Sequence, residues 1–146
     1  MTLALHVARP DELDVSTLYA LLRLRVDVFV VEQRCPYPEL DGRDLEPTTR
    51  HVWLGPSRGE PVAYLRLLAE PSGAVRIGRV CTAPAGRGGG LSKRLVSSAL
   101  ELIGADRPCV LDAQSYLVDF YRGFGFEPTG DEFVEDGIPH VPMRRG

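Results

Sequence analysis

The chain has 146 residues, with 17 Lys and Arg side chains against 20 Asp and Glu, which gives a net charge of −3. This length favours one domain over residues 1–146, and a hydrophobic content of 44% is typical of a soluble globular protein. The acidic balance argues against a general nucleic-acid binder, which carries a basic surplus. No apolar run is long enough to span a bilayer and no signal pattern opens the chain, so we expect no membrane partner and a cytoplasmic location.

The cysteine spacing argues against a disulfide framework and against a structural zinc site. Cys35, Cys81 and Cys109 are unevenly spaced and include no C-x-x-C pair. Disulfide frameworks need an even set of cysteines, and zinc sites need ligands in closely spaced pairs. We therefore expect neither disulfides nor a bound metal ion.

The first half of the chain predicts a strand, a helix, a loop and a strand hairpin. Alternating residues at 3–7 predict the first strand, and Ser16 is placed to cap a helix that continues into the apolar run 26–31. Prolines end that helix. The acidic loop that follows is either a binding loop or a solvated surface loop. Apolar runs at 51–54 and 61–68, with a turn between them, predict the hairpin.

The second half predicts a strand–helix–strand unit, a short helix and two more strands. The β-branched run 75–82 is followed by apolar residues at helical spacing and then by the apolar run 109–113. Strands joined through one helix are usually parallel. Ser115 is placed to cap the short helix, which Gly125 closes. The last two strands are expected at 126–134 and 138–144. The fold class is therefore a mixed α/β sheet with antiparallel meanders and one parallel crossover.

A glycine-rich turn joins the strand at 75–82 to the long helix. The turn contains Pro84, Gly86, Gly88, Gly89 and Gly90. The first turn of a helix leaves backbone N–H groups unpaired, the helix dipole adds partial positive charge there, and glycine lets a ligand approach closely. Such a turn favours phosphate binding. The spacing matches neither the Rossmann fingerprint nor the P-loop, so a loop that only turns the chain remains an alternative.

Two motifs resemble those of the GNAT acyltransferase superfamily. Arg87, Gly90 and Ser92 stand at the marked positions of its pyrophosphate loop, [QR]-x-x-G-x-[GA], with a small serine in place of the last glycine or alanine. The segment 120–126 is similar to the Y-x-x-x-G-F segment of the superfamily, and Gln114 stands seven residues before its tyrosine. The deduced order of strands and helices agrees with the same fold.

Further segments resemble the ElaA-like branch of this superfamily and extend over nearly the whole chain. They are Leu22–Tyr37, Asp41-Gly42, Arg50-His51, Ala113-Gln114 and Glu135–His140. The resemblance implies a central, mostly antiparallel sheet flanked by helices, with one parallel strand pair splayed to admit a cofactor. It also implies transfer of an acetyl group from acetyl-CoA to a primary amine of a small molecule or peptide, by direct attack on the thioester.

The resemblance implies a set of cofactor-binding residues. Backbone N–H groups of 88–93 would hold the pyrophosphate, and the end of the strand at 75–82 would pair with the pantetheine arm. The expected contacts with acetyl-CoA are Val80, Cys81, Thr82, Arg87, Gly88, Gly89, Gly90, Leu91, Ser92, Lys93, Gln114 and Tyr121.

Four residues are candidates for proton transfer. Tyr121 would protonate the departing thiolate, although at helical spacing it could instead be a core aromatic residue. The base that deprotonates the ammonium would be Glu32, His51 or His140. Each base also has a structural alternative: an ion pair with Arg23 or Arg25 for the glutamate, and a hydrogen-bonded buried position for each histidine.

Other functions remain open from the sequence. The run 22–29 is also similar to acyl-homoserine-lactone synthases, which share this fold, and a non-catalytic acyl-CoA-binding module would carry the same glycine turn. The acidic loop 39–46 favours a cationic acceptor. The acceptor, the base and the oligomeric state, with a homodimer as one option, are not determined by the sequence.

Overall fold

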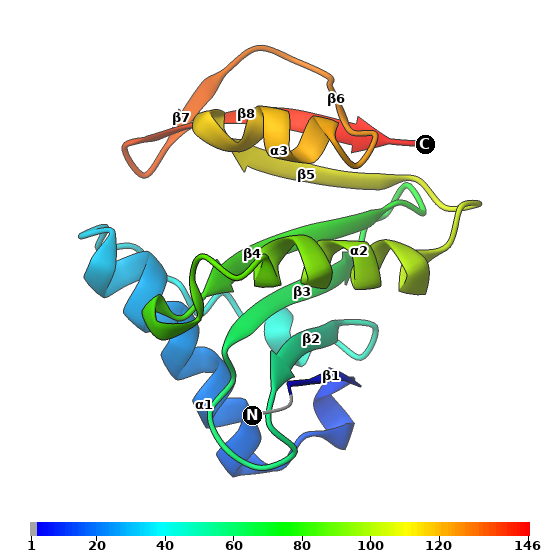
Figure 1. Cartoon of the computed structure of the whole chain (residues 1–146). Helices are drawn as coiled ribbons and strands as arrows, with labels where there is room; N and C mark the ends of the chain where they lie inside the picture. The colour runs from blue at the N-terminus through cyan, green and yellow to red at the C-terminus, as the bar shows by residue number, and fades with distance from the viewer. Residues whose placement is uncertain (1–2) are drawn as a thin grey trace.

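The computed structural model describes residues 3–146, which form one mixed sheet with helices on both faces (Figure 1). The strands are β1 (Ala4–Ala8), β2 (Arg50–Gly55), β3 (Ala63–Ala69), β4 (Val75–Thr82), β5 (Cys109–Gln114), β6 (Glu127–Pro128), β7 (Phe133–Glu135) and β8 (Ile138–Arg145). The α-helices are α1 (Val15–Val26), α2 (Leu91–Ile103) and α3 (Val118–Arg122). The sheet order is β1-β2-β3-β4-β5-β8-β6, with β7 also paired to β8.

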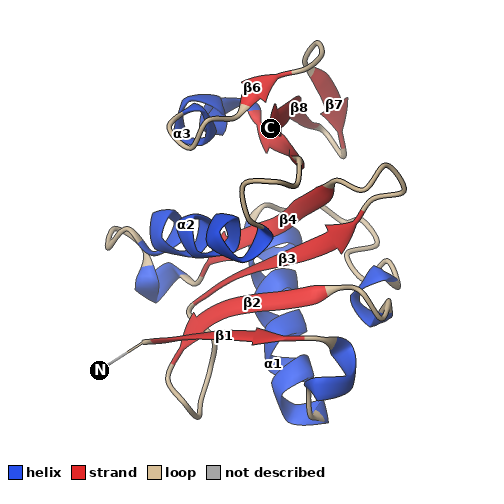
Figure 2. Cartoon of the chain, turned by 90° about the vertical axis from the view of Figure 1, so that its right-hand side faces the viewer, coloured by secondary structure: helices blue, strands red, loops and turns tan. Residues whose placement is uncertain are grey.

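Strand alternation puts α1 and α2 on opposite faces of the sheet. Leu65 and Leu67 of β3 belong to the core that α2 covers, and Tyr64, which directly precedes Leu65, belongs to the core that α1 covers. Successive side chains of a strand point to opposite faces, so the two cores are separated by the sheet. In both views α3 lies on the same side of the sheet as α2, against β5 and β8 (Figures 1 and 2). We call these the α2 face and the α1 face.

Strand β4 runs parallel to β5 for a short distance and then leaves it. Among the described residues the parallel pairing covers two positions, Val75 with Cys109 and Arg76 with Val110. The register between β3 and β4 shifts after this point, and Arg79 adopts a φ of 55° in the left-handed region. This geometry is that of a β-bulge, which bends the strand that carries it. Figure 1 shows the two strands diverging toward the end of β4 where α2 begins.

Helix α1 is followed directly by one turn of wider π-helix. The residue that caps α1 is Asp14, whose carboxylate accepts a hydrogen bond from the N–H of Thr17 at 2.7 Å, so the expectation that Ser16 is the cap was wrong. Residues Asp27–Glu32 form a π-helix that continues α1. Such segments are rare and frequently lie at functional sites. Here the segment carries Phe29 and Glu32 to the end of β4.

The C-terminal quarter differs from the sequence prediction in two details. The single strand expected at 126–134 is two short strands, and Gly130, a residue type that weakens a strand interior, lies in the irregular stretch between them. Ser115 does not cap α3, which begins at Val118. The Ser115 hydroxyl instead donates to Glu132 at 2.7 Å. The remaining predicted elements, including the parallel pair, are confirmed. Across residues 3–146, no helix is both long and apolar enough to cross a membrane.

Candidate active site

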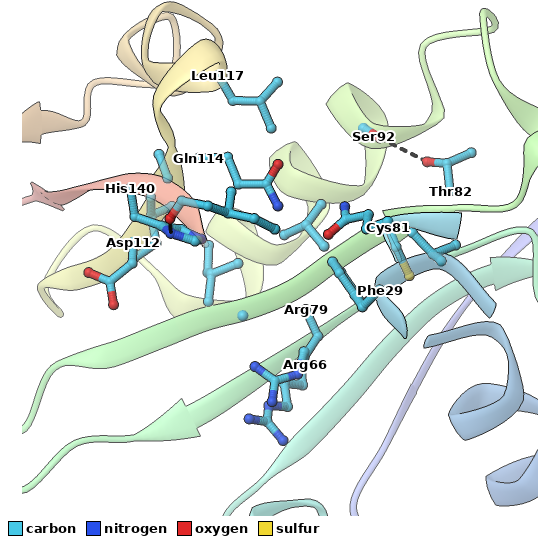
Figure 3. A pocket seen from close by; sticks show the side chains of 18 of the residues that line it. Phe29, Arg66, Arg79, Cys81, Thr82, Ser92, Asp112, Gln114, Leu117 and His140 are labelled. Atoms are coloured by element: carbon cyan, nitrogen blue, oxygen red, sulfur yellow. Dashed lines mark hydrogen bonds between the residues drawn. The ribbon is translucent and has the colours of Figure 1, made fainter. Parts of the chain in front are cut away.

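A cleft of about 940 Å³ opens where β4 leaves β5 and is lined from both faces of the sheet (Figure 3). Ser92 and Leu117 line it on the α2 face. Gln114 and His140, which are paired across β5 and β8, line it on the other face. A ligand can therefore extend through the sheet, with one end on each face.

The glycine turn forms one end of this cleft. Gly86 is required for packing, because a Cβ atom there would lie 2.3 Å from Val62. Gly88 and Gly90 have φ values of 88° and 74°, and a Cβ atom on either would meet nothing within 4 Å. Gly90 is the N-cap of α2 and provides no side-chain oxygen to the helix.

The start of α2 is suited to hold a phosphate group. Within the described chain, the N–H groups of residues 88–93 make no backbone hydrogen bond outside the helix, and the first turn of a helix pairs none of its own. The Ser92 hydroxyl is 2.9 Å from that of Thr82, so the serine is accommodated by the strand (Figure 3). Unpaired N–H groups, open space and a helix dipole fit the pyrophosphate of an acyl-CoA.

Arg87 and Glu32 form a two-bond ion pair beside the glycine turn. Both nitrogen–oxygen distances are 2.6 Å, and both side chains are exposed by more than 40%. The hydrogen bonds from Arg87 lower the pKa of Glu32. The alternative in which Glu32 pairs with Arg23 or Arg25 is therefore wrong, and its role as a base remains a prediction.

Tyr121 lines the cleft from α3 and is 5% exposed. Its ring packs edge-on against Phe120 and Phe126, which fixes its orientation. Its hydroxyl group makes no hydrogen bond within residues 3–146. Burial raises the pKa of Tyr121 to about 12. The phenol therefore keeps its proton at any physiological pH and can donate it to a group in the cleft.

His140 faces the cleft from β8 with one tautomer favoured. Its Nδ1 lies 2.8 Å from the carbonyl oxygen of Ile138, which can only accept, so Nδ1 carries the proton. The ring stacks on Phe133 at 5.7 Å. The Nε2 atom makes no hydrogen bond to the described part of the chain and is left as an acceptor. Cys81 is a poor nucleophile by contrast, because burial raises the pKa of its thiol to about 12.

The structure does not bring His51 to the cleft. It is fully buried, its Nε2 donates to the carbonyl of Asp44 at 3.0 Å, and its Nδ1 accepts from the hydroxyl of Tyr64 at 2.7 Å. With both nitrogens engaged it matches the structural alternative, so we do not carry it forward as a base. Gly89 is the one predicted cofactor residue that does not line the cleft among the described residues; its neighbours Gly88 and Gly90 do.

The acidic loop is held by arginines of the same chain. Arg25 is fully buried and binds the carboxylates of Glu39 and Asp44. Arg66 binds Asp41 at 2.6 Å and Asp44 at 3.0 Å. Carboxylates that are already paired offer little attraction to a cationic ligand, which removes the reason for expecting a cationic acceptor. The loop is neither an unpaired acidic surface nor fully solvated.

Sequence reasoning missed Arg66, Gly78 and Arg79 as residues that line the cleft. The two arginines belong to strands and contact loop residues 22 to 40 positions away, so no local pattern links them. One signal was present: a glycine inside a strand pattern indicates a bulge or a close approach of another group. Gly78 stands immediately before the bulge at Arg79.

The fold and cleft are those of an acyltransferase that binds an acyl-CoA, and comparisons with known proteins agree. The family model described as "Acetyltransferase (GNAT) domain" matches residues 27–145. The UPF0039 protein Rv2851c of Mycobacterium tuberculosis is 55% identical over 99% of this chain and 94% of its own. Protein ElaA of Escherichia coli is 48% identical over 92% of this chain and 91% of its own.

Two crystal structures are similar over the whole chain. An acyl-CoA N-acyltransferase from Pseudomonas aeruginosa has a TM-score of 0.93 at 42% identity and covers 99% of this chain and 100% of its own. Escherichia coli ElaA has a TM-score of 0.92 with the same identity and coverage. The chain belongs to the GNAT acyltransferase family, in its ElaA-like branch.

The burial of His51 predicts how stability depends on pH. Burial lowers the pKa of His51 below 6.5, so the unfolded chain binds a proton that the folded chain does not. The free energy of unfolding should therefore fall as the pH drops below about 6.5, by up to about 1.4 kcal/mol per pH unit from this residue. Urea unfolding between pH 7.5 and 5 measures this slope.

The matched variant is His51→Gln, whose amide can keep both hydrogen bonds without titrating. Its slope over the same pH range should be smaller than that of the parent. Equal slopes in the two proteins would show that His51 does not contribute to acid sensitivity.

Proposed function

We propose that this protein transfers an acetyl group from acetyl-CoA to a primary amine. The observation that carries the proposal is one continuous cleft that joins the unpaired N–H groups at the start of α2 to Tyr121 and His140. The family supports acyl transfer from an acyl-CoA to an acceptor. The choice of acetyl donor and amine acceptor is the proposal. The cytoplasmic location expected from the sequence remains a prediction.

The α2 face provides the donor half of the site. The N–H groups of residues 88–93 bind the pyrophosphate, and Lys93 adds a charge beside it. The edge of β4 beyond Arg76 has left β5, so its backbone is available to the pantetheine arm as it would be to a neighbouring strand. Gln114, which faces the cleft, is within the same opening for a pantetheine amide (Figure 3).

When bound, acetyl-CoA supplies an acyl group activated as a thioester. A nitrogen–carbon bond forms between the acceptor amine and the acyl carbon as the carbon–sulfur bond breaks. A backbone N–H near Val80 stabilises the charge that develops on the carbonyl oxygen. Tyr121 donates its proton to the sulfur that leaves with the electron pair, and the proton that the attacking nitrogen loses as the amide forms returns to the phenolate through water. Burial raises the pKa of the Tyr121 phenol. Burial in the same cleft also raises the pKa of the departing CoA thiol, which narrows the difference between the pKa of the donor and that of the acceptor.

His140 is the base that the geometry favours. An alkylammonium must lose a proton before its nitrogen can attack, and the Nε2 atom of His140 has an unshared pair directed away from its Nδ1–H bond. Glu32 is a weaker candidate, because its ion pair with Arg87 lowers its pKa. A water molecule could complete the path from the amine to the imidazole.

Calorimetric titration with acetyl-CoA, followed by a screen of amines that detects released thiol, tests the proposal. We expect binding with one site per chain and thiol release that depends on the amine. Binding without transfer to any amine would support a non-catalytic acyl-CoA-binding module instead. Product analysis with acetyl-CoA against acyl-carrier protein separates amine acetylation from the chemistry of an acyl-homoserine-lactone synthase.

Replacing Tyr121 by Phe should lower kcat by about 10²- to 10⁴-fold, because it removes the proton donor and keeps the ring that packs on Phe120 and Phe126. The dissociation constant of acetyl-CoA should remain close to that of the parent. Steady-state kinetics and calorimetry measure the two quantities. Turnover equal to the parent would refute the acid role.

Replacing Gly90 by Asp should abolish acetyl-CoA binding, since the side chain would enter the open space at the start of α2 with a negative charge. Asp is a favourable N-cap residue, so the helix should persist. The matched control is Gly90→Asn, which has the same size and no charge and also tolerates the left-handed conformation. Calorimetry should show a larger loss for Asp than for Asn; equal losses would mean that charge plays no part.

A further inference from the structure

Arg66 has one buried hydrogen-bond donor that the protein leaves unused. Its side chain is 4% exposed, and its two terminal nitrogens bind Asp41 and Asp44. The Nε atom is closed to bulk water and has no hydrogen-bond partner within residues 3–146. An unpaired buried donor of a charged group is costly, and in native proteins it usually has a partner of some kind.

Gly78 leaves room for a small group next to this nitrogen. It is the residue directly opposite Arg66 in the pairing of β4 with β3, and both face the cleft on the α1 face. A Cβ atom at Gly78 would have one neighbour within 4 Å outside its own stretch of chain, the Nε of Arg66 at 3.9 Å.

Neither backbone nor packing requires a glycine at this position. The φ of Gly78 lies outside the left-handed region, and the contact of 3.9 Å is an ordinary one. Glycine weakens the interior of a strand and often marks a place where another group approaches closely. The group that approaches here is therefore expected to come from outside the chain.

A second guanidinium lies beside the same space. Arg79 follows Gly78 in the bulge, and its Nη2 is 3.6 Å from the Asp41 oxygen that Arg66 contacts at 2.6 Å. Its Nε and Nη2 bind Glu39, while its Nη1 has no hydrogen-bond partner in the part of the chain that the structure describes. Figure 3 shows the two arginines on the same side of β4.

We propose that the acceptor carries a carboxylate close to its amine, and that this carboxylate binds over Gly78 against Arg66 and Arg79. Both unused donors belong to guanidinium groups, which bind carboxylates more strongly than neutral carbonyls. The nearby acids Glu39, Asp41 and Asp44 are already paired, so a cationic group would find no open partner. The inference rests on the proposed amine transfer and names the class of its acceptor.

Paired acceptors that differ in one group test the proposal. Transfer is measured with free α-amino acids, with the matching amino alcohols, and with short peptides that carry a carboxylate near an amine. The amino acids should exceed their amino alcohols in kcat/KM by about tenfold or more, the range expected for hydrogen bonds to a charged group. The peptide arm tells whether the carboxylate belongs to a free amino acid or to a peptide.

Gly78→Ala is the decisive variant, because the fold should accept the methyl group while the subsite loses its space. The ratio between amino acid and amino alcohol should collapse toward one through a higher KM for the acid. Binding of acetyl-CoA should be retained, and the melting temperature should be unchanged or raised. Gly78→Ser, whose hydroxyl oxygen can satisfy Arg66 itself, should give the same loss of preference.

The remaining outcomes are also decisive. Equal use of acids and alcohols by the parent, or an unchanged ratio in Gly78→Ala, overturns the subsite. A lower melting temperature of Gly78→Ala also overturns it, because the glycine would then serve the fold. If no amine accepts the acetyl group, the proposed function fails instead. Calorimetry with the same amino acids and CoA then decides the subsite: carboxylate-dependent binding that Gly78→Ala abolishes supports it, and its absence overturns it.

Discussion

The separation of β4 from β5 is the constraint on which the whole site depends. A sheet that stayed paired would close the cleft and would use the backbone groups of β4 for strand pairing. The parallel ladder instead stops after Arg76, and the bulge at Arg79 turns the rest of β4 away. Because α2 begins where this bent strand ends, the same departure places the N–H groups of its first turn at the mouth of the opening. One local irregularity thus creates both the gap and the open helix start at its mouth.

A buried network of ion pairs holds the acidic loop 39–46, which lines the other end of the cleft. Arg25 links α1 to Glu39 and Asp44, and Arg66 and Arg79 link the same loop to β3 and β4. Breaking a buried ion pair leaves an uncompensated charge and costs about 3–5 kcal/mol. Each link also has a defined geometry, so the network fixes the position of a loop that has little regular structure of its own. Ion pairs therefore hold this side of the cleft in place, although the loop that forms it contains no strand.

Much of the fold could be predicted from the sequence because its signals are local. The strand before Pro84, the glycines after it and the apolar spacing of α2 lie within one continuous stretch, and the parallel pair follows from that order. The acids of the loop could not be interpreted in the same way. Their partners stand 14 to 40 residues away, and one sequence does not show which arginine reaches which carboxylate. The prediction of the α1 cap failed for another reason: Asp14 and Ser16 are both good cap residues two positions apart, so residue type alone does not choose between them.

The sequence indicates the donor half of the site more clearly than the acceptor half. The reason is that the two halves lie on different faces of the sheet and are built from different groups. In the proposed function the donor half binds a pyrophosphate through backbone groups, and recognition by backbone groups leaves a glycine pattern in the sequence. The proposed acceptor half is lined by side chains from β3, β4 and β8, which come together only in the folded chain. The clearest sign of the acceptor half in the sequence is Gly78, a glycine inside a strand at a position where a β-branched or aromatic residue would be expected. The absence of a side chain is informative here because the structure has room for one.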